Sequence, residues 1–235
     1  MGNKNVSNEK NRPSINNKLL IIIFVWIIYV IWILKFSSLT LSVPNFIIHL
    51  IFLFIIIFTF KDDLLISLNK LKKSSKKEKL RIILYFLGFL GIMILSNIII
   101  SIYTKITGNN FVQDSSSNAI GQVFNVLPFG TIFVCFLTIL FYPVVEELVF
   151  RKSLRPAIKN GVLFVIITSL LSWYFQVTLL NPNINEFILA IQTFLNSIFA
   201  GIIYVKTNNI CYTIFSRMLF NIFICIMQFS YLIIS

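Results

Sequence analysis

The chain has 235 residues, of which 57% are hydrophobic, and its 20 basic and 8 acidic side chains give a net charge of +12. This composition, with 25 Phe and only 8 Gly, indicates an integral membrane protein and excludes a soluble globular one. Apolar runs at or near the ~20 residues that cross a bilayer recur along most of the chain.

Seven such runs can be read along the chain. They are about Leu19–Phe36, Asn45–Phe60, Leu80–Tyr103, Phe129–Val145, Val162–Leu180, Phe187–Val205 and Ile210–Ile234. Backbone groups cannot stay unpaired in lipid, and the runs are too continuous for the alternating pattern of a membrane barrel. We therefore predict an all-α fold, a polytopic transmembrane helix bundle of about seven spans.

The basic residues indicate how this bundle is oriented. The segment Lys61–Arg81 holds eight basic residues against three acidic ones. If the N-terminus lies inside, alternation of the spans places this segment, the basic loop 151–159 and Lys206 all on the cytoplasmic side, as basic loops prefer. The positive charge is then explained by topology and by anionic lipid headgroups, so we expect the bilayer and not a nucleic acid as its partner. A multi-pass protein of the plasma membrane is the expected location.

The chain divides into three parts by composition. Residues 1–18 are polar and rich in Asn and Lys, which predicts a disordered cytoplasmic tail. Residues 19–117 form a three-helix membrane region whose basic loop 61–81 has leucines at helical spacing, typical of an amphipathic helix on the cytoplasmic leaflet. Residues 118–235 form the remaining membrane core.

Glu146 and Glu147 are the most informative residues of this core. They are the only acidic residues between Asp114 and Glu186, and they directly follow an apolar run. A carboxylate at or inside a bilayer is costly and usually has a task or a partner. The pair is therefore the first candidate for a functional site.

The neighbours of the pair suggest two interpretations. Arg151 lies four residues after Glu147, so on a helix the two side chains share a face and can form an ion pair. Glu146 points about 100° away around the helix and has no local partner. This arrangement fits one held and one working carboxylate. The alternative is that all three side chains are solvated at the cytoplasmic boundary.

The stretch around the glutamates resembles the CPBP family of intramembrane proteases, which includes CAAX prenyl-protein endoproteases and bacteriocin-processing or immunity proteins. The resemblance spans roughly Phe129 to Gln228. It is carried by Pro143–Arg151, which reads Pro-Val-Val-Glu-Glu-Leu-Val-Phe-Arg, and by Phe199–Thr207, which reads Phe-Ala-Gly-Ile-Ile-Tyr-Val-Lys-Thr. The first motif is fairly specific, and the second supports it.

The resemblance implies a site in which paired glutamates meet a Phe-x-x-x-His and a His-x-x-x-Asn motif around zinc or another divalent metal. In this chain Gln176 stands at the first histidine position and Arg217 at the second, whereas Asn221 is kept. Glutamine is a poor zinc ligand and a guanidinium cannot ligate at all, so we expect no bound cofactor. Arg217 either forms a bidentate contact with Glu146 inside the bundle or snorkels to the membrane interface.

The site residues implied by the motifs are Glu146, Glu147, Arg151, Gln176, Arg217 and Asn221. Because both histidines are replaced, we expect a catalytically degenerate relative that acts by binding or regulation, with a membrane protein or a hydrophobic or prenylated peptide as partner. One alternative is an active endopeptidase with an altered, glutamate-based site. A second is a small transporter. The heavy use of Ile, Asn, Lys and Phe is typical of an AT-rich microbial genome, so we expect a bacterial protein. An immunity-type role is what the resemblance implies for it.

Overall fold

The computed structural model describes residues 26–31, 43–108, 128–179 and 190–234, with the backbone alone at 128–129, 175–179 and 231–234. Regular structure in these ranges consists of helices only, which confirms the all-α prediction. Besides a helical stretch at 26–31, the elements are α2 (Val43–Thr59), α3 (Lys61–Lys73), α4 (Lys76–Thr107), α6 (Pro128–Phe136), η2 (Leu137–Phe141), α7 (Tyr142–Glu146), η3 (Glu147–Lys152), α8 (Gly161–Leu179), α10 (Ile191–Thr207) and α11 (Ile210–Ile234).

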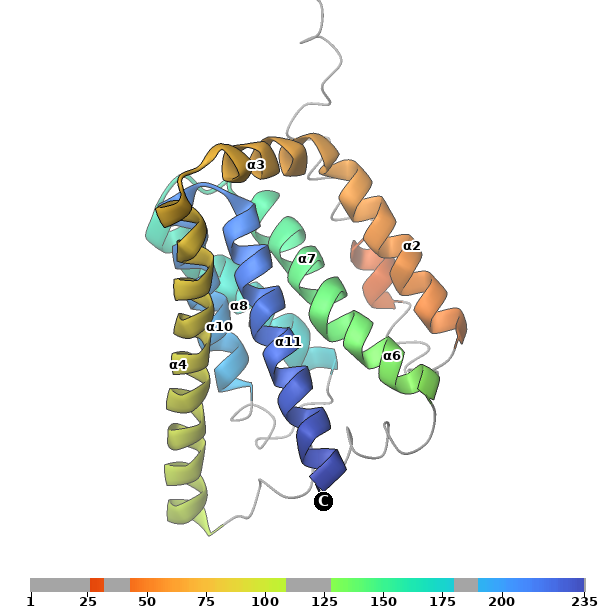
Figure 1. Ribbon diagram of the computed structural model, residues 1–235, viewed down its shortest axis with the longest axis vertical. Coiled ribbons are helices and arrows are strands. Elements are labelled where there is room, and N and C mark those ends of the chain that lie inside the picture. Colours follow the sequence, from red (N-terminus) through yellow and green to blue (C-terminus); the bar gives the residue numbers. More distant parts are fainter. Residues whose placement is uncertain (1–25, 32–42, 109–127, 180–189, 235) are drawn as a thin grey trace, which may run out of the picture.

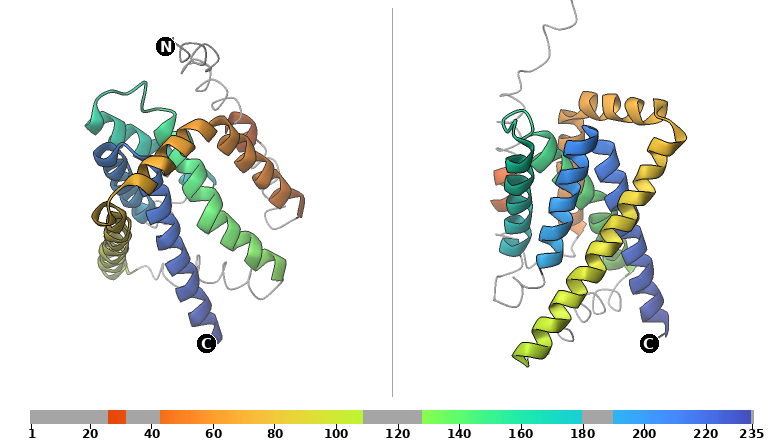
Figure 2. Two further views of the ribbon diagram at one scale, coloured as in Figure 1. Left: turned by 45° about the horizontal axis from the view of Figure 1, so that its top comes forward. Right: turned by 90° about the vertical axis from the view of Figure 1, so that its left-hand side faces the viewer.

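Helix α3 is the helix predicted in the basic loop. It turns away from α2 by 72° and lies across one end of the bundle (Figures 1 and 2). Two contacts attach it there. The side-chain amide of Asn209 donates to the Ser67 carbonyl at 3.0 Å, and Lys152 Nζ lies 3.2 Å from Asp63 Oδ1. The amphipathic helix is thus held against the ends of η3 and α11.

Helix α4 begins and ends at signals that can be read in the sequence. Ser75 Oγ accepts a hydrogen bond from the Glu78 N–H at 3.3 Å, while Glu78 Oε2 accepts one from the Ser75 N–H at 3.2 Å. This capping box starts the helix directly after α3. Gly108, at φ 67°, ends it, because glycine adopts the left-handed conformation without steric cost.

The described residues contain three helical stretches long and apolar enough to cross a membrane. They are Lys76–Thr107, Gly130–Lys152 and Ile210–Ser230, and the bent pair α2–α3 counts as a fourth if taken as one span. Helices α8 and α10 overlap two further predicted runs, whereas Leu19–Phe36 lies largely outside the described residues. The protein is therefore membrane-embedded and in contact with lipid. The number of seven spans and the inside position of the N-terminus stay predictions.

Helix α11 packs in the middle of the bundle, with α4 on one side and α7 on the other (Figure 1). Helix α10 packs against α8, α4 and α11. Close approach of α8 is possible because Gly201 has no side chain: a Cβ there would lie 3.3 Å from both γ-carbons of Val165. Between α4, α10 and α11, the ring of Phe89 lies 5.0 Å from that of Phe199 and 5.8 Å from that of Phe220. These contacts hold together the helices that carry the site.

The contact between Phe199 and α4 gives a test of this packing. A Cβ at Gly88 would overlap the Phe199 ring, whereas a Cβ at Gly91 on the same helix meets nothing within 4 Å. We expect Gly88→Ala to destabilise the protein by about 1–3 kcal/mol through overpacking. Gly91→Ala should leave stability unchanged or raise it, since alanine is the better helix former. Thermal unfolding in detergent measures both, and equal midpoints for the two variants would contradict this packing.

Candidate functional site

The two glutamates lie inside one continuous helix, Gly130–Lys152, and not after its end. Two π-helical segments flank them. In η2 the Tyr142 N–H bonds to the Leu137 carbonyl, and at the end of η3 the Ser153 N–H bonds to the Leu148 carbonyl at 3.1 Å, each five residues back. Such wide turns are rare and frequently occur at functional sites. Glu146 is the last residue of the short α-helical turn α7 between them, and Glu147 is the first residue of η3.

Both glutamates are shielded from solvent. Glu146 is 1% exposed, and Glu147 and Arg151 are 0% exposed. The interpretation that these residues are solvated at the cytoplasmic boundary is therefore wrong. A buried ionised carboxylate needs an opposite charge or strong hydrogen bonds. The partners of the two carboxylates come from the same helix and from two others, α8 and α11.

Arg217 of α11 binds both glutamates. Its Nη2 lies 2.7 Å from Glu146 Oε2, and its Nη1 lies 2.9 Å from Glu147 Oε1. The side chain is only 11% exposed, so it faces into the bundle and does not snorkel. The pairing with Glu146 that the sequence left open is thus present, and it extends to Glu147. The expectation of one held and one working carboxylate is corrected, because both are held.

Arg151 provides the second cation. Its Nη1 donates to Glu147 Oε1, the ion pair expected from the four-residue spacing. Its Nη2 donates to the Ser197 carbonyl at 2.8 Å and to Ser197 Oγ at 2.9 Å, which connects η3 to α10. Two buried atoms in this cluster, Arg151 Nε and Glu147 Oε2, have no hydrogen-bond partner among the described residues.

Helix α8 contributes a hydroxyl to the cluster. Ser172 Oγ donates to Glu146 Oε2 at 3.1 Å, from the motif position at which the resemblance expects phenylalanine. Gln176 follows one turn later on α8, and its side chain lies outside the described part. Ser172 and Ser197 were missed from the sequence. The signal that points to them is a small polar residue on an apolar helix next to each family motif.

Asn221 forms a hydrogen bond to the backbone and not to the carboxylates. Its Nδ2 donates to the Thr138 carbonyl at 2.6 Å. In the π-helical register of η2, that carbonyl would accept from the residue five positions on, which is Pro143 and has no N–H. The asparagine amide therefore replaces the donor that proline lacks. An oxyanion donor, the role implied for this position by resemblance, would need this amide to point at a substrate.

The cluster is electrically neutral as a whole. Two carboxylates, Glu146 and Glu147, face two guanidinium groups, Arg151 and Arg217. A guanidinium presents its donors in a planar fork, and Arg217 uses both tips on different carboxylates. Glu147 Oε1 accepts from Arg151 and Arg217, and Glu146 Oε2 accepts from Arg217 and Ser172. The arrangement suits rigid joining of helices better than proton transfer to and from water.

The residues present do not fit a catalytic divalent metal. No three His, Cys, Asp or Glu side chains gather as a metal site anywhere in the described ranges. The single histidine, His49, bonds through Nδ1 to the Asn45 carbonyl of its own helix at 2.7 Å. At the glutamates, the guanidinium of Arg217 stands between the two carboxylates, and it repels a cation and cannot ligate one.

The fold and site define a class: a helical membrane protein with a paired-glutamate motif buried in its bundle. Residues 128–223, less than half of the chain, match the family model of the type II CAAX prenyl endopeptidase, Rce1-like. This segment contains every site residue named above, and the match supports membership of the CPBP/CAAX protease family. Searches of curated proteins and of solved structures gave no match.

The ion cluster predicts non-additive effects on stability. Arg217→Leu leaves two buried carboxylates with one cation, and we expect a loss of about 3–5 kcal/mol. Adding Glu146→Gln restores neutrality, so the double variant should be more stable than Arg217→Leu alone. Arg81→Leu, at an exposed position on α4, is the matched control and should change stability by less than about 0.5 kcal/mol. Unfolding in detergent measures these three variants and Glu146→Gln alone, and additive losses would contradict the ion cluster.

The role of Asn221 can be tested through Pro143. Asn221→Leu should cost about 1–3 kcal/mol, because the Thr138 carbonyl loses its donor. In a Pro143→Ala background the cost should shrink, since alanine restores an N–H at the position that the π register requires. Thermal midpoints of the two single variants and the double variant decide the matter. An equal cost of Asn221→Leu in both backgrounds would refute this role.

Proposed function

We propose that this protein is a catalytically degenerate member of its family that acts by binding or regulation. The observation that carries the proposal is the contact of one guanidinium, that of Arg217, with both glutamates. Its Nη2 lies 2.7 Å from Glu146 and its Nη1 lies 2.9 Å from Glu147. A working base must take a proton from water in the reaction, and here a permanent cation contacts both candidate bases. Arg217 supplies the positive charge that a metal would otherwise supply. Unlike a metal, its guanidinium has no coordination position that could hold a water molecule.

The state of Asn221 supports the same conclusion. Its amide is bonded to the Thr138 carbonyl, so it is committed to the helix that carries the glutamates. Electrostatic catalysis requires donors aimed at the atom on which charge develops. The glutamates, which the resemblance implies as bases, are thus bonded to Arg217, and Asn221, implied as the oxyanion donor, is bonded to the backbone. What remains is a membrane bundle with a rigid, neutral polar centre.

The proposed partner is a membrane protein or a hydrophobic or prenylated peptide, as the family's substrates would suggest for a relative that binds without cleaving. A bacterial plasma membrane and an immunity-type role are the biological setting we propose, with 118–235 as the family core and 19–117 as an added membrane region. The net positive charge serves topology, and no nucleic acid is involved in this proposal. No cofactor is required.

An active, glutamate-based endopeptidase is the second candidate. One observation favours it: Glu147 Oε2 is buried and has no hydrogen-bond partner among the described residues. This oxygen is available to a water or a substrate group. Against it stands the other oxygen of the same carboxylate, which accepts from both Arg151 and Arg217.

Incubation of the purified protein with prenylated and with unmodified hydrophobic peptides distinguishes the two candidates. We expect no cleavage, with or without added zinc, because both carboxylates are ion-paired. Peptide binding without cleavage, measured by fluorescence anisotropy, would agree with the proposal. Cleavage that persists with a chelator and disappears in Glu146→Ala would instead establish the glutamate-based enzyme.

Restoring the motif histidines tests why activity is absent. The double variant Gln176→His, Arg217→His supplies two imidazoles beside two carboxylates, a set suited to zinc. We expect this variant to retain about one zinc per chain after dialysis and the wild-type protein to retain far less, measured by elemental analysis. Equal zinc content in both proteins would show that Arg217 does not replace a metal.

A further inference from the structure

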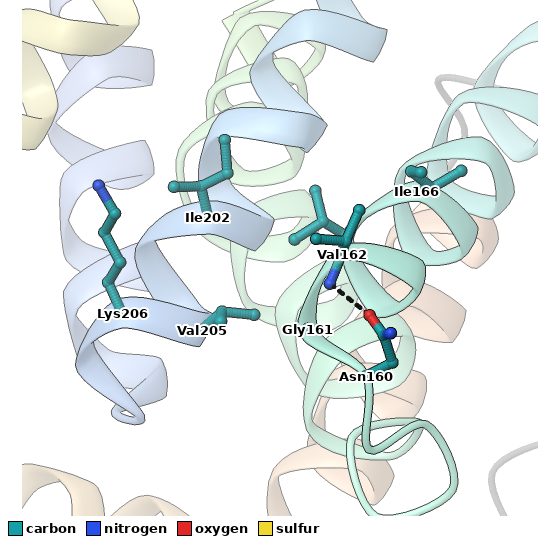
Figure 3. A pocket seen from close by; sticks show the side chains of 8 residues that line it. Asn160, Gly161, Val162, Ile166, Ile202, Val205 and Lys206 are labelled. Atoms are coloured by element: carbon teal, nitrogen blue, oxygen red, sulfur yellow. Dashed lines mark hydrogen bonds between the residues drawn. The ribbon is translucent and has the colours of Figure 1, made fainter.

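A groove on the outside of the bundle, between α8 and α10, lies apart from the glutamate site. It has a volume of about 550 Å³. Its walls are aliphatic side chains from both helices: Val162, Val165, Ile166, Ile202 and Val205 (Figure 3). The size falls within the range of small-molecule sites, about 300–1,000 Å³.

The groove opens sideways, to the surroundings of the bundle. Val162 is 71% exposed and Ile166 is 48% exposed, so apolar side chains of α8 face outward along its rim. The two helices approach closely at Gly161, where a Cβ would lie 3.2 Å from Val205 Cγ1. In a membrane-embedded protein, such an outward apolar groove is bordered by acyl chains.

One end of the groove is positively charged. Lys206 lines it from the last turn of α10, and the N-terminus of α8, with Asn160 as its cap, lines it from the other side (Figure 3). A helix N-terminus carries a partial positive charge, and no acidic residue occurs in the first turn of α8. No carboxylate lines the groove, and within the described residues none forms an ion pair with Lys206.

The charged end lies at the level expected for lipid headgroups. Asn209, three residues after Lys206, donates to the Ser67 carbonyl of α3, the basic amphipathic helix that lies across this end of the bundle. A helix of this kind marks the boundary between acyl chains and headgroups. The groove therefore extends from that boundary along α8 and α10 with its cation at the headgroup end.

We propose that this groove is a binding site for one anionic phospholipid. An acyl chain lies against the valine and isoleucine walls, and the phosphate lies at Lys206 and the N-terminus of α8. Charge complementarity selects an anionic over a zwitterionic headgroup. The site goes beyond the proposed function, because it uses none of the ion-cluster residues and does not depend on whether the protein cleaves peptides.

Native mass spectrometry of protein purified with an equimolar mixture of phosphatidylglycerol and phosphatidylcholine of identical acyl chains tests the proposal. The wild-type protein should retain phosphatidylglycerol preferentially. Lys206→Gln should lower the ratio of the two retained lipids about fivefold, the effect of one cation near a membrane surface. Val162→Trp, at an outward position, should fill the groove and lower the retention of both.

Lys105→Gln is the matched control, an exposed lysine in the last turn of α4. It should leave the lipid ratio unchanged. Two results would overturn the proposal: a wild-type ratio of one, or equal effects of Lys206→Gln and Lys105→Gln. A dimer of the chain that Val162→Trp dissociates would also overturn it, because a second copy would then occupy the groove.

Discussion

Two adjacent carboxylates inside an apolar bundle must be neutralised, and this requirement organises the rest of the structure. One cation, Arg151, comes from the same helix, and the other, Arg217, comes from α11. Ser172 of α8 and Ser197 of α10 complete the contacts. Four separate segments of the chain thus meet at one neutral cluster. Removing any charged member leaves its partners uncompensated, so the cluster specifies how the helices fit together more than it adds net stability.

Arg217, at the position of a motif histidine in the resemblance, supplies positive charge to both glutamates but cannot ligate a metal. A metal ion and a guanidinium both place positive charge beside the paired glutamates, but only the metal can hold and activate a water molecule. Arg217 reaches Glu146 and Glu147 with separate nitrogens, a geometry that its planar fork permits and that a single ammonium would not. Under the proposed function, the helix arrangement is kept without the reaction. Asn221 is likewise bonded within the protein, to the Thr138 carbonyl.

Much of the fold follows from the sequence, because apolar runs in lipid must be helical and the Ser75–Glu78 capping box marks a helix start. The Glu147–Arg151 contact also follows, since it depends on local spacing alone. The contact of Arg217 with the glutamates was one of two possibilities, the other being that it snorkels to the membrane interface. Nothing in the sequence says which way a long side chain on a membrane helix will turn. Ser172 and Ser197 were not predicted at all. Their contacts join segments more than twenty residues apart and depend on helix packing and on two π-helical turns that no periodicity reveals.

The most direct test of the central claim is the position of the Arg217 guanidinium in a bilayer. Solid-state NMR of protein with ¹⁵N-labelled arginine and ¹³C-labelled glutamate side chains can measure dipolar couplings from its Nη atoms to carboxylate carbons and to lipid ³¹P, with Arg217→Lys to assign the signal. We predict strong couplings to two carboxylate carbons, those of Glu146 and Glu147, and none to phosphorus. Coupling of the Arg217 signal to lipid phosphorus, without coupling to either carboxylate, would contradict the account.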